Sequence, residues 1–185
     1  MSDLNLATMT ELESGLESIR HSPKDGGVLE MIVRRPRVDE RENLTEATLD
    51  VAEGLIGDGW RQRGSKRTPD GTADPENQLN IMNSRVVALL AGDKTRWPLA
   101  GDQLFIDLDF SEENLPPGTR FSLGSAVIEV TSQPHTGCKK FLARYGEAAL
   151  KFVNSPVRKE LHLRGLCAKV VQPGTIRVGD TAKKV

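Results

Sequence analysis

The feature that most constrains the fold is a series of short, apolar, β-branched segments separated by glycine- and proline-rich turns. Residues 28–33 are mostly apolar, and Ala47, Leu49 and Val51 alternate with polar residues, as in a half-buried strand. Similar segments occur at 79–81, 103–108, 120–123, 126–130, 165–171 and 175–178. Long helices do not alternate with them, so a doubly wound sheet is not expected. The pattern predicts a mainly β fold, a closed or partly open β-barrel with short peripheral α-helices.

Turn and cap residues place the connections between these segments. Gly124-Ser125 predicts a hairpin between 120–123 and 126–130, and Gln172-Pro173-Gly174 predicts a tight turn between the last two segments. Ser84 is the expected cap of a helix that ends at Gly92. Two short helices are expected at about 139–145 and 147–153, with Gly146 between them.

The domain organisation follows from a change of pattern near Gly27. Residues 1–26 read as an N-terminal helical appendage, since Thr8–Glu11 and Thr10–Glu13 both fit a capping box and Leu12, Leu16 and Ile19 recur at helical spacing. Residues 27–181 are predicted to form the barrel domain, and 182–185 a tail.

Composition and charge exclude several classes of function. The 185 residues carry a net charge of −1, so neither nucleic-acid nor membrane-surface binding is expected from bulk electrostatics. No apolar run is long enough to span a bilayer, and the N-terminus does not resemble a secretory signal. Two widely separated cysteines make no disulfide framework, which favours a reducing, cytoplasmic compartment.

The stretch Pro134-His135-Thr136-Gly137-Cys138-Lys139-Lys140-Phe141 is the strongest candidate for chemistry. It follows a strand and a proline and is expected to open a helix. Cations next to a thiol, and the amide groups of a helix N-terminus, stabilise the thiolate, which is the form that acts as nucleophile or metal ligand. Cys138 is therefore the predicted working residue. Cys167 lies in the middle of a strand and is interpreted as structural.

His135 precedes Cys138 by three residues and has several possible roles. A zinc site is poorly supported, because Cys167, His21 and His162 show no pairing that would complete four ligands. A cysteine–histidine hydrolase with His135 or His162 as base is conceivable. The plainer interpretation is a hydrogen-bonded loop residue.

Basic residues near the cysteine form a candidate anion site. Together they could hold a phosphate, for which arginine is the better donor; they are Lys139, Lys140, Arg144, Arg158 and Arg164. The charged run 34–41 is interpreted as a solvated loop, with a loop facing an anion as the minority alternative. Residues 61–77 are expected to form a long polar loop, either functional or disordered.

At these residues the chain resembles the MOSC family, named for the C-terminal domain of molybdenum cofactor sulfurases, and in particular its bacterial stand-alone members. The resemblance rests on the stretch from His135 to Phe141, then on 144–146, 153–155, 163–165 and 171–180, with further matches at 57–59 and 115–119. It implies a β-barrel with Cys138 at a pocket. It also implies that His135, Thr136, Lys139, Lys140, Arg144 and Arg164 contact a molybdenum–pterin cofactor, with Cys138 as metal ligand.

Two sulfur chemistries follow from the resemblance. The first is reduction of N-hydroxylated small molecules at the molybdenum, with electrons from a separate redox partner protein. The second is a persulfide on Cys138, loaded by a cysteine desulfurase and passed on in metal–sulfur or cofactor assembly. A non-catalytic anion-binding module is a third alternative, so whether the chain is an enzyme stays open at this point.

Overall fold

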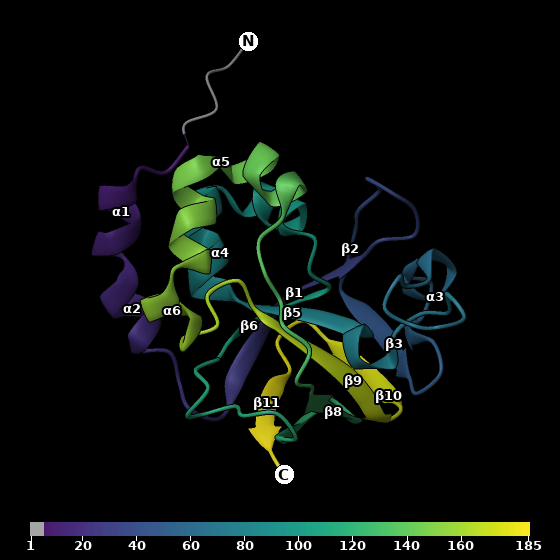
Figure 1. The fold of residues 1–185 in the computed structure, drawn as a ribbon. Helices are drawn as coiled ribbons and strands as arrows, with labels where there is room; N and C mark the ends of the chain where they lie inside the picture. Colours follow the sequence, from purple (N-terminus) through teal and green to yellow (C-terminus); the bar gives the residue numbers. More distant parts are fainter. Residues whose placement is uncertain (1–5) are drawn as a thin grey trace.

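The computed structural model describes residues 6–185, apart from the side chains of residues 157 and 158. Its centre is a closed barrel of seven strands in the order β1, β11, β7, β8, β9, β5 and β6, after which β6 pairs with β1 (Figure 1). The strands are β1 (Gly27–Arg34), β5 (Leu79–Asn83), β6 (Leu104–Asp107), β7 (Arg120–Leu123), β8 (Ala126–Val130), β9 (Leu166–Gln172) and β11 (Thr181–Lys184). The predicted barrel is confirmed, and it is closed. The hairpin of β7 and β8 around Gly124 is as expected.

The strands β1, β5 and β6 are buried on both faces, which explains their nearly continuous apolar sequence. In β1 a bulge between Leu29 and Met31 shifts the alternation of side chains between the two faces of the strand. Leu29 and Ile32 join the cluster that fills the barrel, whereas Met31 and Val33 join a second cluster on its outside. The barrel therefore has a second hydrophobic layer against one part of its wall.

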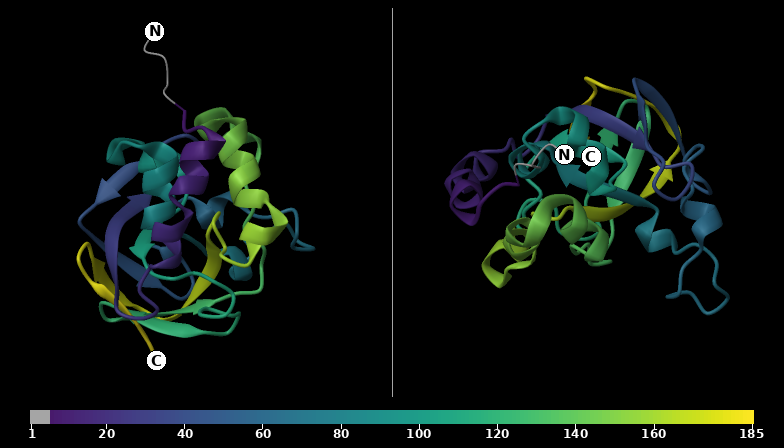
Figure 2. Two further views of the ribbon diagram at one scale, coloured as in Figure 1. Left: turned by 90° about the vertical axis from the view of Figure 1, so that its left-hand side faces the viewer. Right: turned by 90° about the horizontal axis from the view of Figure 1, so that it is seen from above.

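Helices cover that outer face, as Figure 2 shows from two directions. They are α1 (Met9–Ser14), α2 (Leu16–Arg20), α4 (Ser84–Ala91), the 3₁₀ helix η2 (Lys94–Ala100), α5 (Lys139–Asn154) and α6 (Pro156–Lys159). The connection through α4 and η2 allows β5 and β6 to be parallel, since parallel neighbours need a crossover. None of the described helices has the length and apolar character that a membrane crossing requires.

The predicted N-terminal helix is divided in two at Gly15. The capping box of Thr8 and Glu11 is present, and Leu12 is fully buried against the body of the protein. Residues 1–5 of the predicted appendage lie outside the described residues.

The C-terminal residues differ from the predicted tail. Strand β11 covers Thr181–Lys184, pairs with β1 and β7, and buries Ala182, so it closes the barrel. Its sequence, Thr-Ala-Lys-Lys, has only one apolar residue facing inward, which is why periodicity did not identify it as a strand.

A smaller sheet consists of β10 (Gly174–Arg177), β3 (Glu46–Asp50) and β4 (Gly54–Leu55), and β2 (Glu42–Leu44) extends the main sheet beside β1. The turn at Pro173 therefore does not join two paired strands. Strand β9 stays in the barrel, while β10 pairs with β3. The cap of α4 is Asn83 and not Ser84, because the Asn83 side chain accepts the hydrogen bond from Arg85 N.

The long loop after β4 contains α3 (Trp60–Arg63) and the 3₁₀ helix η1 (Pro75–Asn77). Its remaining residues are held by local hydrogen bonds such as Ser65 N to Gly71 O. The sequence predicted a polar loop here, and the two short helical turns within it were not anticipated.

Candidate functional site

The last turn of η2, together with Gly101 after it, is contacted by four arginines from three remote parts of the chain. The carbonyl oxygens of residues 98, 99, 100 and 101 each accept a hydrogen bond from a different arginine. The bonds are Arg41 Nε to Pro98 O at 3.2 Å, Arg144 Nη1 to Leu99 O at 2.8 Å, Arg164 Nη2 to Ala100 O at 2.9 Å and Arg35 Nη1 to Gly101 O at 2.7 Å. The last carbonyls of a helix tend to lack partners within it, and these arginines supply partners for them. Pro98 O also accepts from Gly101 N at 3.2 Å.

Three carboxylates hold three of these arginines in place. Arg35 makes a bidentate pair with the buried Asp58, with both nitrogen–oxygen distances 3.0 Å, and Arg63 Nη2 lies 3.7 Å from the same side chain. Asp39 pairs with Arg144 at 3.0 Å and with Lys140 at 3.6 Å. Arg164 pairs with the third carboxylate, Asp102. We call Arg35, Arg41, Arg63, Arg144 and Arg164 the arginine cluster.

The arginine cluster carries more positive charge than its carboxylates neutralise. Burial, and then repulsion from Arg144 and Arg35, lowers the pKa of Arg41. Burial followed by repulsion from Arg35 likewise lowers the pKa of Arg63. Crowded like charges have this effect because each destabilises its neighbour's charged form. An anion bound here would remove that repulsion.

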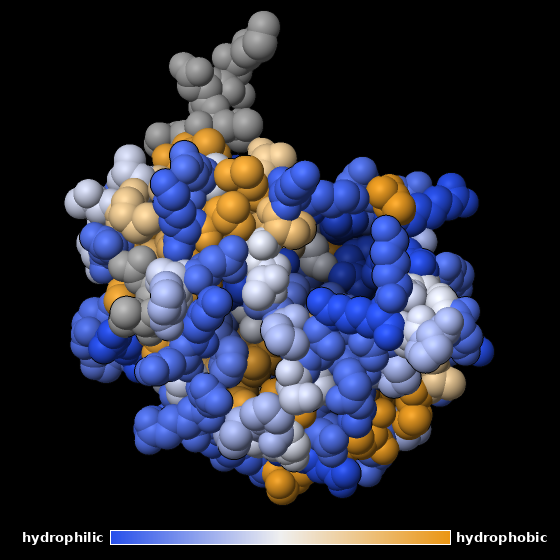
Figure 3. Space-filling model, viewed as in Figure 1, coloured by the Kyte–Doolittle hydropathy of each residue, from blue (hydrophilic) through white to orange (hydrophobic). Residues whose placement is uncertain are grey.

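Two members of the arginine cluster, Arg41 and Arg63, have side-chain N–H donors that are not used in hydrogen bonds. Within the described residues, Arg41 Nη2 donates no hydrogen bond to a carbonyl or carboxylate, and the Arg63 side chain makes only its 3.7 Å ion pair with Asp58. Gly101 leaves room beside Arg41 and Arg144: its φ of +92° suits glycine, and a Cβ there would lie 3.9 Å from Arg144 Nη1 and 4.0 Å from Arg41 Nη2. Figure 3 shows a strongly hydrophilic recess on the side of the molecule next to the α3 loop. These residues fit a phosphate or a comparable anion.

Cys138 is the N-cap of α5, so the segment opens a helix as predicted. Its thiol is exposed and makes no hydrogen bond to a residue that the structure describes. The backbone of Gly137 is fixed to Asn154 at the other end of the helix, through Gly137 N to Asn154 Oδ1 at 3.0 Å. The first two turns of α5 then carry Lys140 and Arg144 to the arginine cluster.

The structure brings together some of the predicted site residues and leaves others apart. Lys140, Arg144, Arg164 and His135 all contact the arginine cluster or its carboxylates. Lys139 and Thr136 are exposed, and neither makes a contact with the cluster among the described residues. The side chain of Arg158 lies outside the described residues.

Asp102 links His135 to Arg164 in the interior. Its Oδ1 lies 2.8 Å from His135 Nε2 and its Oδ2 lies 2.7 Å from Arg164 Nη1. Burial raises the pKa of Asp102, but Arg164 and then His135 outweigh burial, so the pKa is lowered overall. Burial and then Arg164 lower the pKa of His135, against the opposite effect of Asp102. His135 is therefore neutral at pH 7, and Nε2 carries the proton that it donates to the carboxylate.

Cys167 is buried on the outer face of β9, opposite to its neighbours Leu166 and Ala168, which pack inside the barrel, and it is a thiol at neutral pH. Burial, followed by the charge of Asp102, raises its pKa to about 12. Its Sγ donates to Asn77 Oδ1 at 3.2 Å and accepts from Asn80 Nδ2 at 3.5 Å. These contacts agree with a structural role. Within the described part of the chain, no three histidine, cysteine, aspartate or glutamate side chains are grouped so that they could hold a metal ion by themselves.

Sequence reasoning missed Arg35, Arg41, Arg63 and the carboxylates Asp58 and Asp102. The signal for the arginines was their density in 34–41, which was interpreted mainly as a solvated loop, and in 61–67, which was interpreted as part of a long polar loop, either functional or disordered. Arg35 and Arg41 of this loop lie in the cluster, while the minority interpretation, a basic loop facing an anion, stays a prediction.

Comparison with known proteins identifies the family. The MOSC domain model matches residues 72–183, which is more than half of the chain, so this chain belongs to the MOSC family. No curated protein matches it.

Solved structures share the fold. YuaD from Bacillus subtilis is 17% identical over 84% of this chain and 93% of its own, with a TM-score of 0.62. YiiM from Escherichia coli is 21% identical over 85% of this chain and 69% of its own, with a TM-score of 0.50. Likeness at this level of identity defines the fold.

Proposed function

We propose that this MOSC protein binds a molybdenum–pterin cofactor, with the Cys138 thiolate as a ligand of the metal and the arginine cluster as the site of the pterin phosphate. The observation that carries the proposal is an exposed thiol at the start of α5, the same helix whose next turns enter a cluster of arginines with spare donors. Thiolates suit sulfur-rich metal centres, and arginines suit phosphate. The family implies this cofactor.

The roles within the cluster differ. Arg35, Arg144 and Arg164 are held by carbonyl and carboxylate oxygens, so their positions are set before a ligand arrives. Arg41 and Arg63 keep donors for the ligand. A phosphate would therefore be bound directly by Arg41 and Arg63 and oriented by the fixed charge of the others, at little cost in side-chain ordering.

The proposed reaction is reduction of an N–OH group of a small molecule to N–H with release of water, which consumes two electrons and two protons. The bound cofactor would supply the two-electron chemistry, and a separate redox partner protein the electrons. The chain's own residues would hold the cofactor and keep Cys138 at the accessible end of α5.

Metal and pterin content test this proposal. We expect near-stoichiometric molybdenum and pterin in protein from a cofactor-producing host, and neither in protein from a host that cannot make the pterin. Cys138→Ser should lose the molybdenum. Arg41→Gln should lose pterin and metal together, whereas Arg37→Gln, an exposed arginine of the same loop whose ion pair lies outside the cluster, should keep both. Wild-type protein without molybdenum from the producing host would refute cofactor binding.

Activity needs its own test. The loaded wild-type protein should reduce benzamidoxime with reduced methyl viologen as electron donor, and Cys138→Ser should not. Loaded protein that fails with several N-hydroxylated substrates would contradict the reductase part and leave cofactor binding standing.

The exposure of Cys138 favours one alternative, a persulfide carrier, because another protein can reach the thiol. In this case the Cys138 thiolate would attack the persulfide of a cysteine desulfurase, accept its terminal sulfur and release the desulfurase thiolate. Incubation with a desulfurase and cysteine should then give cyanide-labile sulfur, absent in Cys138→Ala. A protein that binds phosphate equally well as wild type and as Cys138→Ser, but takes neither metal nor sulfur, would be an anion-binding module.

A further inference from the structure

Positive charge is concentrated on one part of the surface. Residues 34–42, 58–70 and 139–144 hold 11 of the 25 lysines and arginines of the chain, but only 5 of its 26 aspartates and glutamates. These three segments therefore have a net charge of +6, whereas the rest of the chain has a net charge of −7. The nearly neutral charge of the whole chain conceals this separation.

Ion pairs show that the three segments lie side by side. Asp39 lies 3.0 Å from Arg144 and 3.6 Å from Lys140, which joins the first segment to the start of α5. Arg35 pairs with Asp58, which joins the first segment to the loop after β4. We call the surface formed by these three segments the basic face. Figure 3 shows hydrophilic side chains gathered over it, next to the α3 loop.

The outer cations of the basic face have few partners. Lys66, Arg67 and Lys139 are exposed, and none of them makes an ion pair with a residue that the structure describes. The side chain of Arg37 is 81% exposed, and its ion pair with Glu40 is 3.7 Å long. Exposed charges of this kind contribute little to the stability of the fold. A phosphate bound by the arginine cluster would leave them free, so they suit a larger partner.

Apolar side chains are exposed within the basic face. Val38 is 64% exposed and directly precedes Asp39. Leu99 is 36% exposed, and its carbonyl oxygen accepts the hydrogen bond from Arg144. Neither side chain offers anything to a phosphate or to a nucleic-acid backbone. Protein interfaces combine an apolar centre with a polar rim, so this surface fits a protein better than another kind of polyanion.

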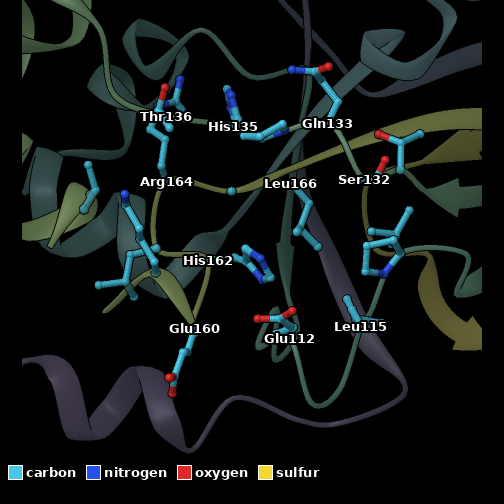
Figure 4. A pocket seen from close by; sticks show the side chains of 18 of the residues that line it. Glu112, Leu115, Ser132, Gln133, His135, Thr136, Glu160, His162, Arg164 and Leu166 are labelled. Atoms are coloured by element: carbon cyan, nitrogen blue, oxygen red, sulfur yellow. The ribbon is translucent and has the colours of Figure 1, made fainter. Parts of the chain in front are cut away.

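Cys138 lies at the edge of the basic face, directly before Lys139, and its thiol is exposed. A protein bound to the basic face would therefore come close to this thiol. A cavity of about 430 Å³ around His162 and Leu166 is a separate opening, with Arg164 in its wall (Figure 4). The outer cations of the basic face do not line this cavity, so a bound protein would leave it open to a small molecule.

We infer that the basic face docks a partner protein with an acidic surface, and that this partner is the electron donor of the proposed reaction. Complementary charge speeds the association of two proteins, and salt weakens this effect. The identity of the partner as electron donor rests on the proposed function. Docking itself does not, because it follows from the exposed charges and apolar side chains of the basic face.

Binding of redox proteins of known charge tests the docking. A flavodoxin and a plant-type ferredoxin, both strongly acidic, are the probes, and the basic cytochrome c is the control. Binding to the full chain is measured by calorimetry and NMR, with and without molybdenum in the protein. We expect both acidic probes to bind, with a Kd that rises at least about ten-fold between about 50 and 300 mM salt. Cytochrome c should not bind.

Charge reversal locates the docking surface. Arg37→Glu, Lys66→Glu and Arg67→Glu should each weaken binding of the acidic probes about two- to five-fold, since each replaces an attractive charge by a repulsive one. Lys183→Glu makes the same change at an exposed lysine of β11, which lies away from α5 in Figure 1, and should leave binding unchanged.

An apolar substitution separates a protein partner from a simple polyanion. Val38→Ser should weaken binding of the acidic proteins and leave binding of a short single-stranded DNA unchanged, because the DNA contacts only the charges. Val185→Ser, at a residue that is 73% exposed in a different part of the molecule, should affect neither. Because Val38 is so exposed, its substitution should not unfold the protein.

Three results would overturn the inference: no binding of either acidic probe, unchanged affinity in all three charge-reversed variants, or tighter binding of the DNA than of both proteins. Turnover tests the role of the partner. Loaded Arg67→Glu should keep the wild-type rate with reduced methyl viologen, a small molecule that needs no docking surface, and should lose rate with the reduced acidic protein. If wild type takes no molybdenum, the proposed function fails, while salt-sensitive binding that the three charge variants weaken would still support docking.

Discussion

Asp102 is the residue that joins the parts of the site. Both of its carboxylate oxygens are used, one by His135 and one by Arg164, and the side chain is fully buried. A buried carboxylate remains ionised only when partners compensate the loss of water, as these two do. The orientation of His135 relative to Arg164 therefore depends on the single side chain of Asp102, which directly follows the arginine-bound segment 98–101.

The lowered pKa of His135 predicts acid sensitivity. Below its ordinary pKa of 6.5, the unfolded chain binds a proton at this residue while the folded chain does not, so stability falls as the pH drops. The slope is at most about 1.4 kcal/mol per pH unit. His135→Gln keeps a donor for Asp102 and should reduce the loss of unfolding free energy between pH 7 and pH 5, measured with urea. His21→Gln, on the exposed end of α2, should retain the wild-type loss; equal slopes in all three proteins would contradict the assignment.

Among the elements, α5 depends on a break in its middle. Gly146 has φ +86° and ψ 175°, so the helix changes direction there, as its sequence predicted. The first part carries Cys138, Phe141 and Arg144, and the second part carries Phe152 and Val153 into the outer core. A straight helix of this length would not bring both parts to their present neighbours.

Gly146→Ala tests this break. This region of backbone conformation is nearly restricted to glycine, and the new Cβ would lie 2.9 Å from Leu6 Cδ1. We expect a loss of about 1–3 kcal/mol in the free energy of unfolding in urea. Ala143→Ser, an exposed substitution in the first part of α5, should cost less than about 1 kcal/mol. An unchanged stability of Gly146→Ala would show that α5 can do without the break.

At the scale of the whole molecule, the barrel depends on its last strand. Strand β11 connects β1, near the start of the domain, to β7. Without it, two strand edges would be open to solvent and the interior would be exposed at the gap.

Removal of residues 182–185 should therefore lower the free energy of unfolding by about 3 kcal/mol or more, since several ladder hydrogen bonds of about 1 kcal/mol each and the burial of Ala182 are lost. Hydrogen exchange should speed up in β1 and β7. Removal of Val185 alone, which is 73% exposed, should have little effect. If the longer deletion is as stable as the shorter one, β11 does not close the barrel in solution.

Sequence alone determined the local structure well. The alternation of apolar and polar residues predicted the strands, and Gly124 predicted the hairpin. Gly146 predicted the break in α5, and the Thr8–Glu11 pair predicted the capping box. Each of these features depends on neighbours only a few residues away. The MOSC resemblance at the cysteine segment was confirmed by the family match. The assignment of Cys138 to the start of a helix was also correct, while its chemical role stays a prediction.

Tertiary structure decided which charges meet. Arg35 and Arg41 come from a loop that was predicted to be solvated, and Arg63 from one predicted to be functional or disordered. Only the folded chain brings them next to Arg144, Arg164 and the segment 98–101 on the outside of the barrel. The cavity around His162 and the pairing of β11 likewise depend on segments that are far apart in the chain. Such contacts join residues that are far apart in the chain, so they produce no periodic pattern in the sequence from which they could be predicted. They form only when the whole barrel has folded.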